Sequence, residues 1–346
     1  MKKQVLVTGG TGYIGSHTAV ELINAGFEVL IIDNLSNSQI EVLEGIEKIT
    51  GVRPIFEKFD ICDNEKVKAF FEKYPNLEAI IHFAAFKAVG ESVDHPLKYY
   101  HNNLASLINL LEGMAKFKVL NLVFSSSCTV YGQPEKLPVN ESAPVLKALS
   151  PYGNTKQISE EIIQDAFIPN KNLKAISLRY FNPIGAHPSA FIGELPLGIP
   201  NNLVPFITQT AIGLRDELKV FGKDYNTPDG SCLRDYIDVV DLARAHVVAI
   251  DRLINNKNKT PFEIFNIGTG NATSVFEIIN TFEKVTGIKI KYKVVERRAG
   301  DVEKVWADTG YANSELGWKA KKTLDETLLS AWNWEKYIRG KNKTSQ

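Results

Sequence analysis

The 346-residue sequence contains only three cysteines, Cys62, Cys128 and Cys232, which are widely spaced and form no Cys-x-x-Cys pair. We therefore expect neither a disulfide framework nor a zinc site, no metal of any kind, and a reducing, cytoplasmic location. No apolar run approaches the roughly 18 residues that a membrane span needs, and we expect no secretory signal. Forty Lys and Arg residues balance forty Asp and Glu residues. The chain thus lacks the basic excess typical of proteins that bind nucleic acid or anionic membranes.

Short apolar runs alternate with longer amphipathic segments through the first half of the chain. The strand-like runs cover residues 5–7, 29–32, 54–56, 79–83, 120–124 and 175–178. The helix-like segments cover residues 14–25, 40–49, 65–73, 97–117 and 151–167. Runs that are apolar on both faces and alternate with helices predict an α/β fold, a Rossmann-like doubly wound parallel sheet.

The alternation ends after Tyr180. Residues 182–202 are rich in Pro and Gly and are predicted to form ordered loops rather than another βαβ unit. Helices are predicted further on, near residues 239–252, 275–285 and 324–338. We therefore expect a Rossmann domain over residues 1–181 and a smaller α/β lobe over residues 182–346. Some segments of that lobe are expected to return to the first domain.

A glycine-rich turn directly follows the first predicted strand and opens a helix. Its outer glycines, Gly9, Gly12 and Gly15, have the spacing Gly-x-x-Gly-x-x-Gly. A tight strand-to-helix turn needs backbone freedom, and the missing side chains let the backbone approach a pyrophosphate. The helix N-terminus then offers N–H groups to the phosphates. This placement favours a dinucleotide site over a turn that is merely rich in glycine.

A carboxylate ends the second predicted strand. Asp33 lies 18 residues after Gly15, where a side chain that hydrogen-bonds a ribose diol is expected. It would repel a 2′-phosphate, and the following Asn34 and Leu35 supply no arginine to bind one. The sequence therefore predicts NAD rather than NADP, against the simpler interpretation of a solvated loop aspartate.

Tyr152 and Lys156 form a Tyr-x-x-x-Lys pair near the start of a predicted helix, where residues four apart are neighbours. A nearby ammonium lowers a tyrosine pKa, so such a tyrosine can act as a base toward an alcohol. Ser127, at the end of the fifth predicted strand, can hydrogen-bond the same hydroxyl. Tyr337 and Lys341 also match the pattern, but their place in the C-terminal helix suggests a solvated surface. We therefore predict Tyr152, Lys156 and Ser127 as catalytic residues.

These motifs together resemble the extended short-chain dehydrogenase/reductase superfamily. Further segments narrow the resemblance to the UDP-glucose 4-epimerase family, over nearly the whole chain from Gln4 to about Trp334. They are the runs at residues 82–92, 125–132, 179–188, 199–203, 234–236 and 297–301. One departure is Cys128, where the family commonly has a smaller alanine.

The resemblance implies two sets of binding residues. Those that match NAD-contacting positions are Gly9, Gly12, Tyr13, Ile14, Gly15, Asp33, Asn34, Leu35, Ser36, Asn37, Ser38, Asp60, Ile61, Phe83, Ala84, Ala85, Phe86, Lys87, Asn102, Ser127, Tyr152, Lys156 and Phe181. Those that match UDP-sugar positions are Lys87, Ser127, Cys128, Thr129, Tyr152, Asn182, Asn202, Leu203, Phe221, Arg234, Arg298, Asp301 and Val305. The resemblance also implies a homodimer. Arginines suit a diphosphate because their guanidinium groups bind it in a bidentate manner.

The implied activity is the interconversion of UDP-glucose and UDP-galactose through oxidation and reduction at sugar C4. A nucleotide-sugar 4,6-dehydratase is the nearest alternative, and it shares the first redox step. A dehydratase also needs an acid/base pair to eliminate water, and that pair resembles an Asp-Glu following a Thr at the end of the fifth strand. Here Thr129 is followed by Val130, which is not a carboxylate. A non-catalytic NAD-binding sensor would be a third possibility, although it would not need to keep Tyr152, Lys156 and Ser127.

One position bears on substrate range. In the epimerase family, a residue just before a Trp-Ala-Asp run borders the hexose pocket, and a bulky tyrosine there is associated with rejection of N-acetylated sugars. The run here begins at Trp306, and the residue before it is Val305. The smaller valine leads to the hypothesis that UDP-GlcNAc and UDP-GalNAc are also substrates. The alternative is that Val305 only packs against its neighbours.

Overall fold

The computed structural model describes residues 2–298 and 302–344. Its centre is a parallel sheet of seven strands in the order β11-β6-β5-β4-β1-β2-β3. The strands are β1 (Gln4–Thr8), β2 (Glu28–Asp33), β3 (Ile55–Lys58), β4 (Leu77–His82), β5 (Asn121–Ser127), β6 (Lys174–Tyr180) and β11 (Phe262–Ile267). This is the Rossmann-like α/β fold that the sequence predicts.

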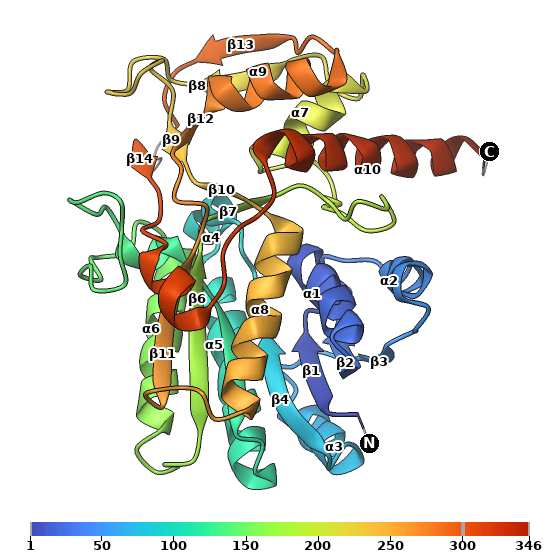
Figure 1. Cartoon of the computed structure of the whole chain (residues 1–346), viewed down its shortest axis with the longest axis vertical. Coiled ribbons are helices and arrows are strands. Elements are labelled where there is room, and N and C mark those ends of the chain that lie inside the picture. The colour runs from blue at the N-terminus through green and yellow to red at the C-terminus, as the bar shows by residue number, and fades with distance from the viewer. Residues whose placement is uncertain (1, 299–301, 345–346) are drawn as a thin grey trace.

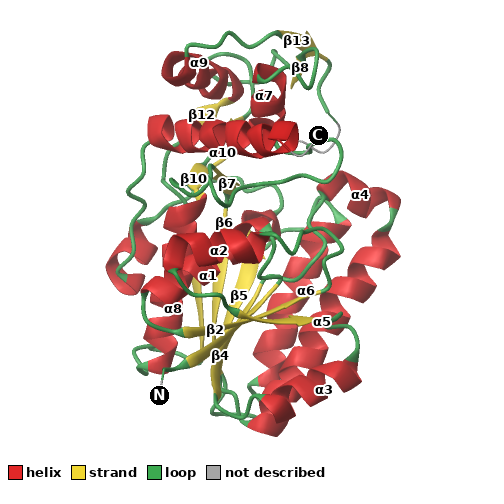
Figure 2. Ribbon diagram, turned by 90° about the vertical axis from the view of Figure 1, so that its right-hand side faces the viewer, coloured by secondary structure: helices red, strands yellow, loops and turns green. Residues whose placement is uncertain are grey.

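The strands are apolar on both faces because helices cover both sides of the sheet. In β1, Val5 and Val7 belong to one buried cluster, whereas Leu6 belongs to the other. Figure 2 shows the two helix layers on opposite sides of the sheet. One layer contains α1 (Tyr13–Asn24), α2 (Val42–Thr50) and α8 (Val239–Ile254), and the other contains α3 (Asn64–Lys73), α5 (Pro96–Phe117) and α6 (Pro151–Ala166). Full burial of one such aliphatic side chain contributes about 1.5–3 kcal/mol.

The predicted elements of the first half agree with the structure, and the differences lie in short or late segments. The predicted loops at residues 182–202 contain a short strand, β7 (Asn182–Ile184), paired with β10 (Tyr236–Asp238). A short helix, α4 (Val89–Asp94), was not predicted. The C-terminal helix α10 (Leu324–Thr344) extends beyond its predicted end at residue 338.

The order of the strands reverses at β1, which pairs with β2 on one side and with β4 on the other. Crossovers to either side therefore leave the carboxyl ends of β1 and β4 uncovered by connecting helices, and ligands bind at such a switch point in doubly wound sheets. The glycine turn follows β1 at this edge. A Cβ on Gly9 would lie 2.9 Å from the backbone nitrogen of Ala84, just past β4.

A second lobe lies beyond the carboxyl edge of the sheet (Figure 1). It is built from α7 (Leu203–Ala211), β8 (Leu218–Phe221), α9 (Val275–Thr286), β13 (Tyr292–Val295) and α10, around its own buried cluster. Three two-residue strands, β9 (Leu233–Arg234), β12 (Thr273–Ser274) and β14 (Lys304–Val305), connect it to the sheet layer. Two elements from this half of the chain, α8 and β11, lie in the first layer instead. Among the described residues, no helix combines the length and apolarity needed to cross a membrane.

Candidate active site

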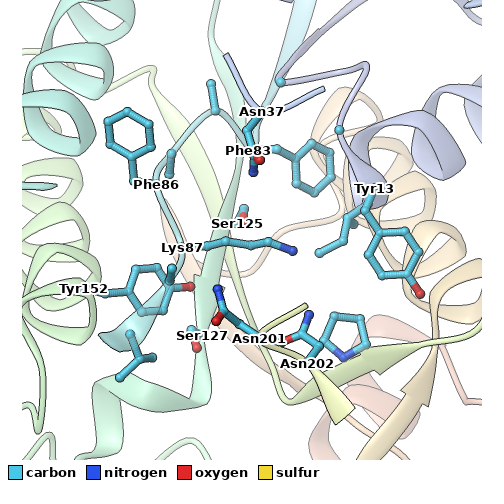
Figure 3. A pocket seen from close by; sticks show the side chains of 18 of the residues that line it. Tyr13, Asn37, Phe83, Phe86, Lys87, Ser125, Ser127, Tyr152, Asn201 and Asn202 are labelled. Carbon is cyan, nitrogen blue, oxygen red and sulfur yellow. The ribbon is translucent and has the colours of Figure 1, made fainter. Parts of the chain in front are cut away.

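A cavity of about 830 Å³ lies between the carboxyl edge of the sheet and the second lobe. Its walls come from the ends of β1, β2, β4 and β5 on one side, and from residues such as Asn182, Arg234 and Val305 on the other. Figure 3 shows Tyr152 and Ser127 pointing into it from one wall and Tyr13 from the opposite wall. The chain thus brings residues separated by more than 100 positions into one chamber.

The glycine turn forms one end of this chamber. Gly9 has a φ of +67°, a conformation that side chains other than glycine's rarely adopt. A Cβ on Gly15 would lie 2.3 Å from the Gly9 carbonyl oxygen, so that position has no room for a side chain. Helix α1 begins after Gly12 with no side chain capping its first N–H groups. The backbone therefore offers an open, positively polarised helix end to a pyrophosphate.

Asp33 is held at the end of β2 with its carboxylate in a fixed position. It accepts hydrogen bonds from the backbone N–H of Thr11 at 3.2 Å and of Leu35 at 2.9 Å, and from the Ser38 hydroxyl at 3.1 Å. The side chain lines the chamber although the residue is buried. A fixed carboxylate beside a glycine cradle suits a ribose diol, so these residues fit NAD.

Tyr152 occupies the first turn of α6, where Ser150 caps the helix through the Gly153 N–H at 3.1 Å. Burial raises the pKa of Tyr152 to about 12, and the hydrogen bond from the Ser127 side chain partly opposes that rise. The sequence predicts a lowered pKa because of Lys156, and the structure differs because desolvation of the phenolate dominates. In the protein alone, Tyr152 is therefore a protonated phenol at neutral pH.

Lys156 lies one turn further along α6 and is almost fully buried. Its ammonium donates a hydrogen bond to the Ser125 carbonyl oxygen at 2.6 Å and lies 6.0 Å from the centre of the Tyr152 ring. Burial lowers the pKa of Lys156 to about 8, and the Glu160 carboxylate opposes this fall. Lys156 thus changes its charge close to physiological pH.

The loop after β4 is tied to the helix that carries Tyr152. Asn103 of α5 accepts a hydrogen bond from the Phe86 N–H at 2.9 Å and donates to the Phe86 carbonyl at 3.1 Å. The same side-chain amide donates to the Thr155 hydroxyl at 3.1 Å, which in turn donates to the Tyr152 carbonyl at 2.7 Å. One buried asparagine therefore fixes the wall of the chamber relative to Tyr152.

An ion pair links the two lobes across the chamber. Lys87 extends from the loop after β4 (Figure 3), and its ammonium lies 3.7 Å from the Glu194 carboxylate. Glu194 also accepts a hydrogen bond from the Asn202 amide at 2.6 Å. Glu194 therefore joins the loop after β4 to the segment that carries Asn202, and all three residues line the chamber.

The far end of the chamber carries two arginines. Arg234 of β9 pairs in register with Val305 of β14, and both side chains line the cavity. Arg298 also lines it, with its guanidinium carbon 5.5 Å from the centre of the Phe221 ring. The two arginines make this end suited to an anion such as a diphosphate. The glycine turn at the other end is suited to a second anion, a pyrophosphate.

Comparison with known proteins agrees with this geometry. Residues 6–330 match the family model described as GDP-mannose 4,6 dehydratase. The chain is 50% identical over 331 residues to UDP-glucose 4-epimerase of Bacillus subtilis, covering 96% of each chain. The UDP-glucose 4-epimerase of Stenotrophomonas maltophila, solved with bound NAD and formylated UDP-arabinopyranose, has a TM-score of 0.94 and 44% identity, covering 98% of this chain and 99% of that one. The Bifidobacterium longum enzyme, solved with NAD+ and UDP, has a TM-score of 0.93 and 44% identity, covering 97% and 99%.

The chain belongs to the UDP-glucose 4-epimerase family. The epimerase assignment is favoured over a dehydratase by the relatives at 48–50% identity, many of which are UDP-glucose 4-epimerases. The local sequence agrees, since Ser127 and Thr129 are followed by Val130, which is buried in an apolar cluster. No carboxylate stands at that strand end to remove a proton for dehydration.

Nearly all the predicted site residues of this epimerase-family chain line the single chamber. They are Gly9, Gly12, Tyr13, Ile14, Gly15, Asp33, Asn34, Ser36, Asn37, Ser38, Asp60, Ile61, Phe83, Ala84, Ala85, Phe86, Lys87, Asn102, Ser127, Cys128, Thr129, Tyr152, Lys156, Phe181, Asn182, Asn202, Arg234, Arg298 and Val305. Leu35, Leu203 and Phe221 do not line it. Leu203 packs against the core of the second lobe, and Phe221 lies beside Arg298. Asp301 lies outside the described residues.

Other lining residues were not predicted as site residues. Among them are Ser125, Tyr180, Glu194 and Asn201. Ser125 and Tyr180 lie at the ends of neighbouring strands and hydrogen-bond each other through their hydroxyls. Their place at the carboxyl ends of predicted strands was a usable signal. Glu194 and Asn201 lie in the loop region 185–202, which carries no periodic pattern that would orient a side chain.

The second Tyr-x-x-x-Lys match in this epimerase-family chain is not at the site. Tyr337 lies in α10, and its ring packs 5.5 Å from that of Phe191 and 6.2 Å from that of Trp334. Tyr337 is half-buried by these contacts, so the expectation of a fully solvated surface was wrong for this residue. It does not line the chamber, which separates it from Tyr152.

Proposed function

We propose that the chain interconverts UDP-glucose and UDP-galactose, with NAD as its resident cofactor. The observation that carries this proposal is the continuity of one chamber. It joins the glycine turn and Asp33 to the Tyr152–Ser127 pair, and it continues to Arg234 at the opposite end. A cofactor and a nucleotide sugar bound at these two ends would meet where Tyr152 stands.

The residues of the first lobe hold NAD in this proposal. The uncapped N-terminus of α1 receives the pyrophosphate, and Asp33 accepts hydrogen bonds from a ribose diol. The Asp33 carboxylate is fixed by Thr11, Leu35 and Ser38, so it would repel a 2′-phosphate at that point. This favours NAD over NADP.

Tyr152 is the acid–base group for the sugar 4-hydroxyl. NAD⁺ held by the glycine turn and Asp33 would supply the hydride chemistry at sugar C4, by which a hydride leaves one face of the sugar and is returned to the other. Tyr152 as phenolate removes the hydroxyl proton, and as phenol it returns the proton after the sugar has turned. Ser127 hydrogen-bonds Tyr152 and orients its oxygen toward the chamber. The ammonium of Lys156 favours the phenolate electrostatically.

The second lobe holds the UDP group in this proposal. Arg234 and Arg298 face the diphosphate, and Asn182 and Asn202 line the same wall. Phe221 contributes through its contact with Arg298 rather than by lining the chamber. Leu203 and Asp301 keep their assignment to the UDP site as predictions from the family resemblance. Residues 182–346 therefore supply most of the substrate lobe, and residues 1–181 most of the NAD-binding domain.

Val305 sets the substrate range in this proposal. It lines the chamber beside Arg234, its register partner on the neighbouring strand β9. It also belongs to an apolar cluster that includes Phe181. The β14 end is anchored by the Val139 N–H, which donates to the Trp306 carbonyl at 2.9 Å. Valine at this anchored position leaves space for a 2-acetamido group. We therefore propose that UDP-GlcNAc and UDP-GalNAc are substrates as well.

We also propose a cytoplasmic homodimer. The described cysteines are all free thiols, which agrees with a reducing compartment. On α5, Leu97 is 80% exposed and Ile108 is 41% exposed, with Leu104 between them. These positions share one helix face, and an exposed apolar stripe of this kind is typical of a protein–protein interface.

Product analysis of the purified chain with UDP-galactose tests the function. The epimerase is expected to form UDP-glucose with no net change in the cofactor's redox state. A 4-keto-6-deoxy product would instead show a dehydratase, and binding of NAD without turnover would show a sensor. Either result would overturn the proposal.

A further inference from the structure

Helix α6 presents three functional groups on one face. Tyr152, Lys156 and Glu160 are each four residues apart, which stacks their side chains along the helix. The first two line the chamber, whereas Glu160 lies deeper, with a side chain only 5% exposed. Burying a carboxylate costs free energy unless it is paired with other polar groups. The partners of Glu160 therefore indicate what its charge does behind the site.

The Glu160 carboxylate ties α6 to the two strands beneath it. Its Oε1 accepts hydrogen bonds from the Ser126 hydroxyl of β5 at 2.6 Å and from the Ser177 hydroxyl of β6 at 2.7 Å. Arg179 of β6 donates from Nε to Oε1 at 3.0 Å and from Nη2 to Oε2 at 2.5 Å. Ser126 lies between Ser125, which accepts the hydrogen bond of Lys156, and Ser127, which hydrogen-bonds Tyr152.

The groups around Lys156 leave Glu160 as its source of negative charge. On α6 it faces Tyr152 and Glu160. On β4 it faces His82, which burial keeps neutral with a pKa of about 3. On β5 it donates to the Ser125 carbonyl and lies 4.8 Å from the centre of the Phe124 ring. On β6, Arg179 and Tyr180 pair in register with Ser126 and Ser127. Among the described residues, these neighbours include no other carboxylate that acts on Lys156.

We propose that Glu160 is a positioning residue that keeps Lys156 in its charged form and holds α6 against the ends of β5 and β6. This role rests on the proposed function, because it matters only if Tyr152 and Lys156 exchange protons with a substrate. Glu160 itself touches neither substrate nor cofactor. It acts through Lys156 and through the serine run at the end of β5.

The proton count of the Tyr152–Lys156 pair makes this role measurable. Only phenolate paired with ammonium is the working form. At low pH both groups are protonated, and the working form grows about tenfold per pH unit. Growth stops once Lys156 loses its proton, because the pair then gains nothing from further deprotonation. The profile of rate against pH therefore has a turning point set by Lys156.

Glu160→Gln removes the charge and keeps one oxygen that can accept the three hydrogen bonds now made to Oε1, although the amide nitrogen in place of Oε2 cannot accept from Arg179 Nη2. We expect its turning point to move to lower pH, while the rate below that point coincides with the wild type. Each pH unit of movement lowers the upper plateau about tenfold. Glu160→Asp keeps the charge, so its turning point should remain where it is in the wild type. The measurement is kcat/KM for UDP-galactose against pH in the NAD-loaded protein.

A second variant covers the case in which Glu160→Gln leaves the Arg179 charge unpaired and prevents folding. Glu160→Gln/Arg179→Met removes the buried ion pair as a unit, a change that proteins often tolerate. Its turning point should lie at a lower pH than that of the wild type and at a higher pH than that of Glu160→Gln. If the single variant cannot be purified, the comparison with the wild type alone is the test. Circular dichroism confirms that each variant is folded.

Two results would overturn the role of Glu160 while leaving the function intact. One is a wild-type-shaped profile in the charge-removed variants, and the other is a uniform fall in rate at every pH, as a purely structural tie would give. Absence of turnover in the wild type would instead overturn the proposed function itself.

Discussion

The ammonium nitrogen of Lys156 lies 6.0 Å from the centre of the Tyr152 ring, one helical turn away on α6. Both groups are buried, and burial acts on them in opposite directions. It raises the pKa of Tyr152 to about 12 and lowers the pKa of Lys156 to about 8. Burial thus shifts each group toward its neutral form, and a bound cation near Tyr152 would shift that residue back toward phenolate.

Tyr152→Phe removes one hydroxyl and leaves the ring in place. We expect turnover of UDP-galactose to fall by about 10²–10⁴-fold, because the lost group acts in proton transfer. Binding of NAD and of the UDP-sugar should survive, as measured by equilibrium titration. Tyr337→Phe is the matched control, since Tyr337 lies in α10 outside the chamber. Turnover close to the wild type in Tyr152→Phe would remove Tyr152 from its role.

Lys156→Met removes the cation beside Tyr152. The pKa of Tyr152 should rise, so phenolate forms only at higher pH and the rate falls at neutral pH. Because burial has lowered the pKa of Lys156, its charge in the wild type is present below about pH 8 and lost above it. That break in the pH–rate profile should vanish in the variant, whereas Lys341→Met should retain it. An unchanged profile in Lys156→Met would contradict the assignment.

Val305→Tyr places a ring where the chamber wall carries an isopropyl group. We expect kcat/KM for UDP-GlcNAc to fall at least tenfold, while kcat/KM for UDP-glucose changes little. Val294→Tyr, on the exposed strand β13, controls for the added ring. The dual-range proposal fails if the wild type leaves UDP-GlcNAc untouched, or if the tyrosine variant converts it equally well.

Gly15→Ala forces a methyl group against the glycine turn. The added Cβ would lie 2.3 Å from the Gly9 carbonyl oxygen and 2.9 Å from the Gly10 Cα, so the turn must move. We expect weaker NAD binding and a loss of about 1–3 kcal/mol in the free energy of unfolding. Isothermal titration and thermal unfolding measure the two effects. Gly340→Ala, whose Cβ would meet nothing within 4 Å, should leave NAD binding unchanged and should not lower the free energy of unfolding, because alanine is favoured over glycine within a helix. NAD affinity equal to the wild type in Gly15→Ala would argue against a pyrophosphate at this turn.

Leu97→Glu introduces a charge into the exposed stripe on α5. If this face joins two copies of the chain, burial of the carboxylate should split the dimer into monomers. Sedimentation at several protein concentrations would show the change. Leu214→Glu, at a separate site where the leucine is 54% exposed, serves as the control. A wild-type mass that is monomeric throughout would end the homodimer proposal.

Much of the first lobe was predictable because its signals are local. Three of these signals lie within the first 33 residues: the apolar run of β1, the glycine spacing after it and Asp33. Helix periodicity predicts that Tyr152 and Lys156 share a face, and their place after the fifth predicted strand separates them from the matching Tyr337 and Lys341. Such features depend on neighbours in the sequence, so a single chain is enough to recognise them.

The contacts between distant segments were not predictable in the same way. No local sequence pattern predicts that β11 pairs with β6 in the sheet, or that Glu194 forms an ion pair with Lys87. The place of Glu160 behind Lys156 follows from helix spacing, but its partners Ser126, Ser177 and Arg179 come from two other strands. These pairs exist only once the layers have packed.

The sequence by itself therefore determined the fold class, the dinucleotide turn and the helix face that carries Tyr152 and Lys156. The tertiary structure decided the protonation of that pair, since the pKa of each group depends on how completely other segments exclude water from it. It also decided that Phe221 contacts Arg298 rather than lining the chamber itself. Periodicity depends on residues that are close in the sequence, so the sequence shows it directly. Desolvation and charge pairing depend on residues that are distant in the sequence and come together only when the chain folds.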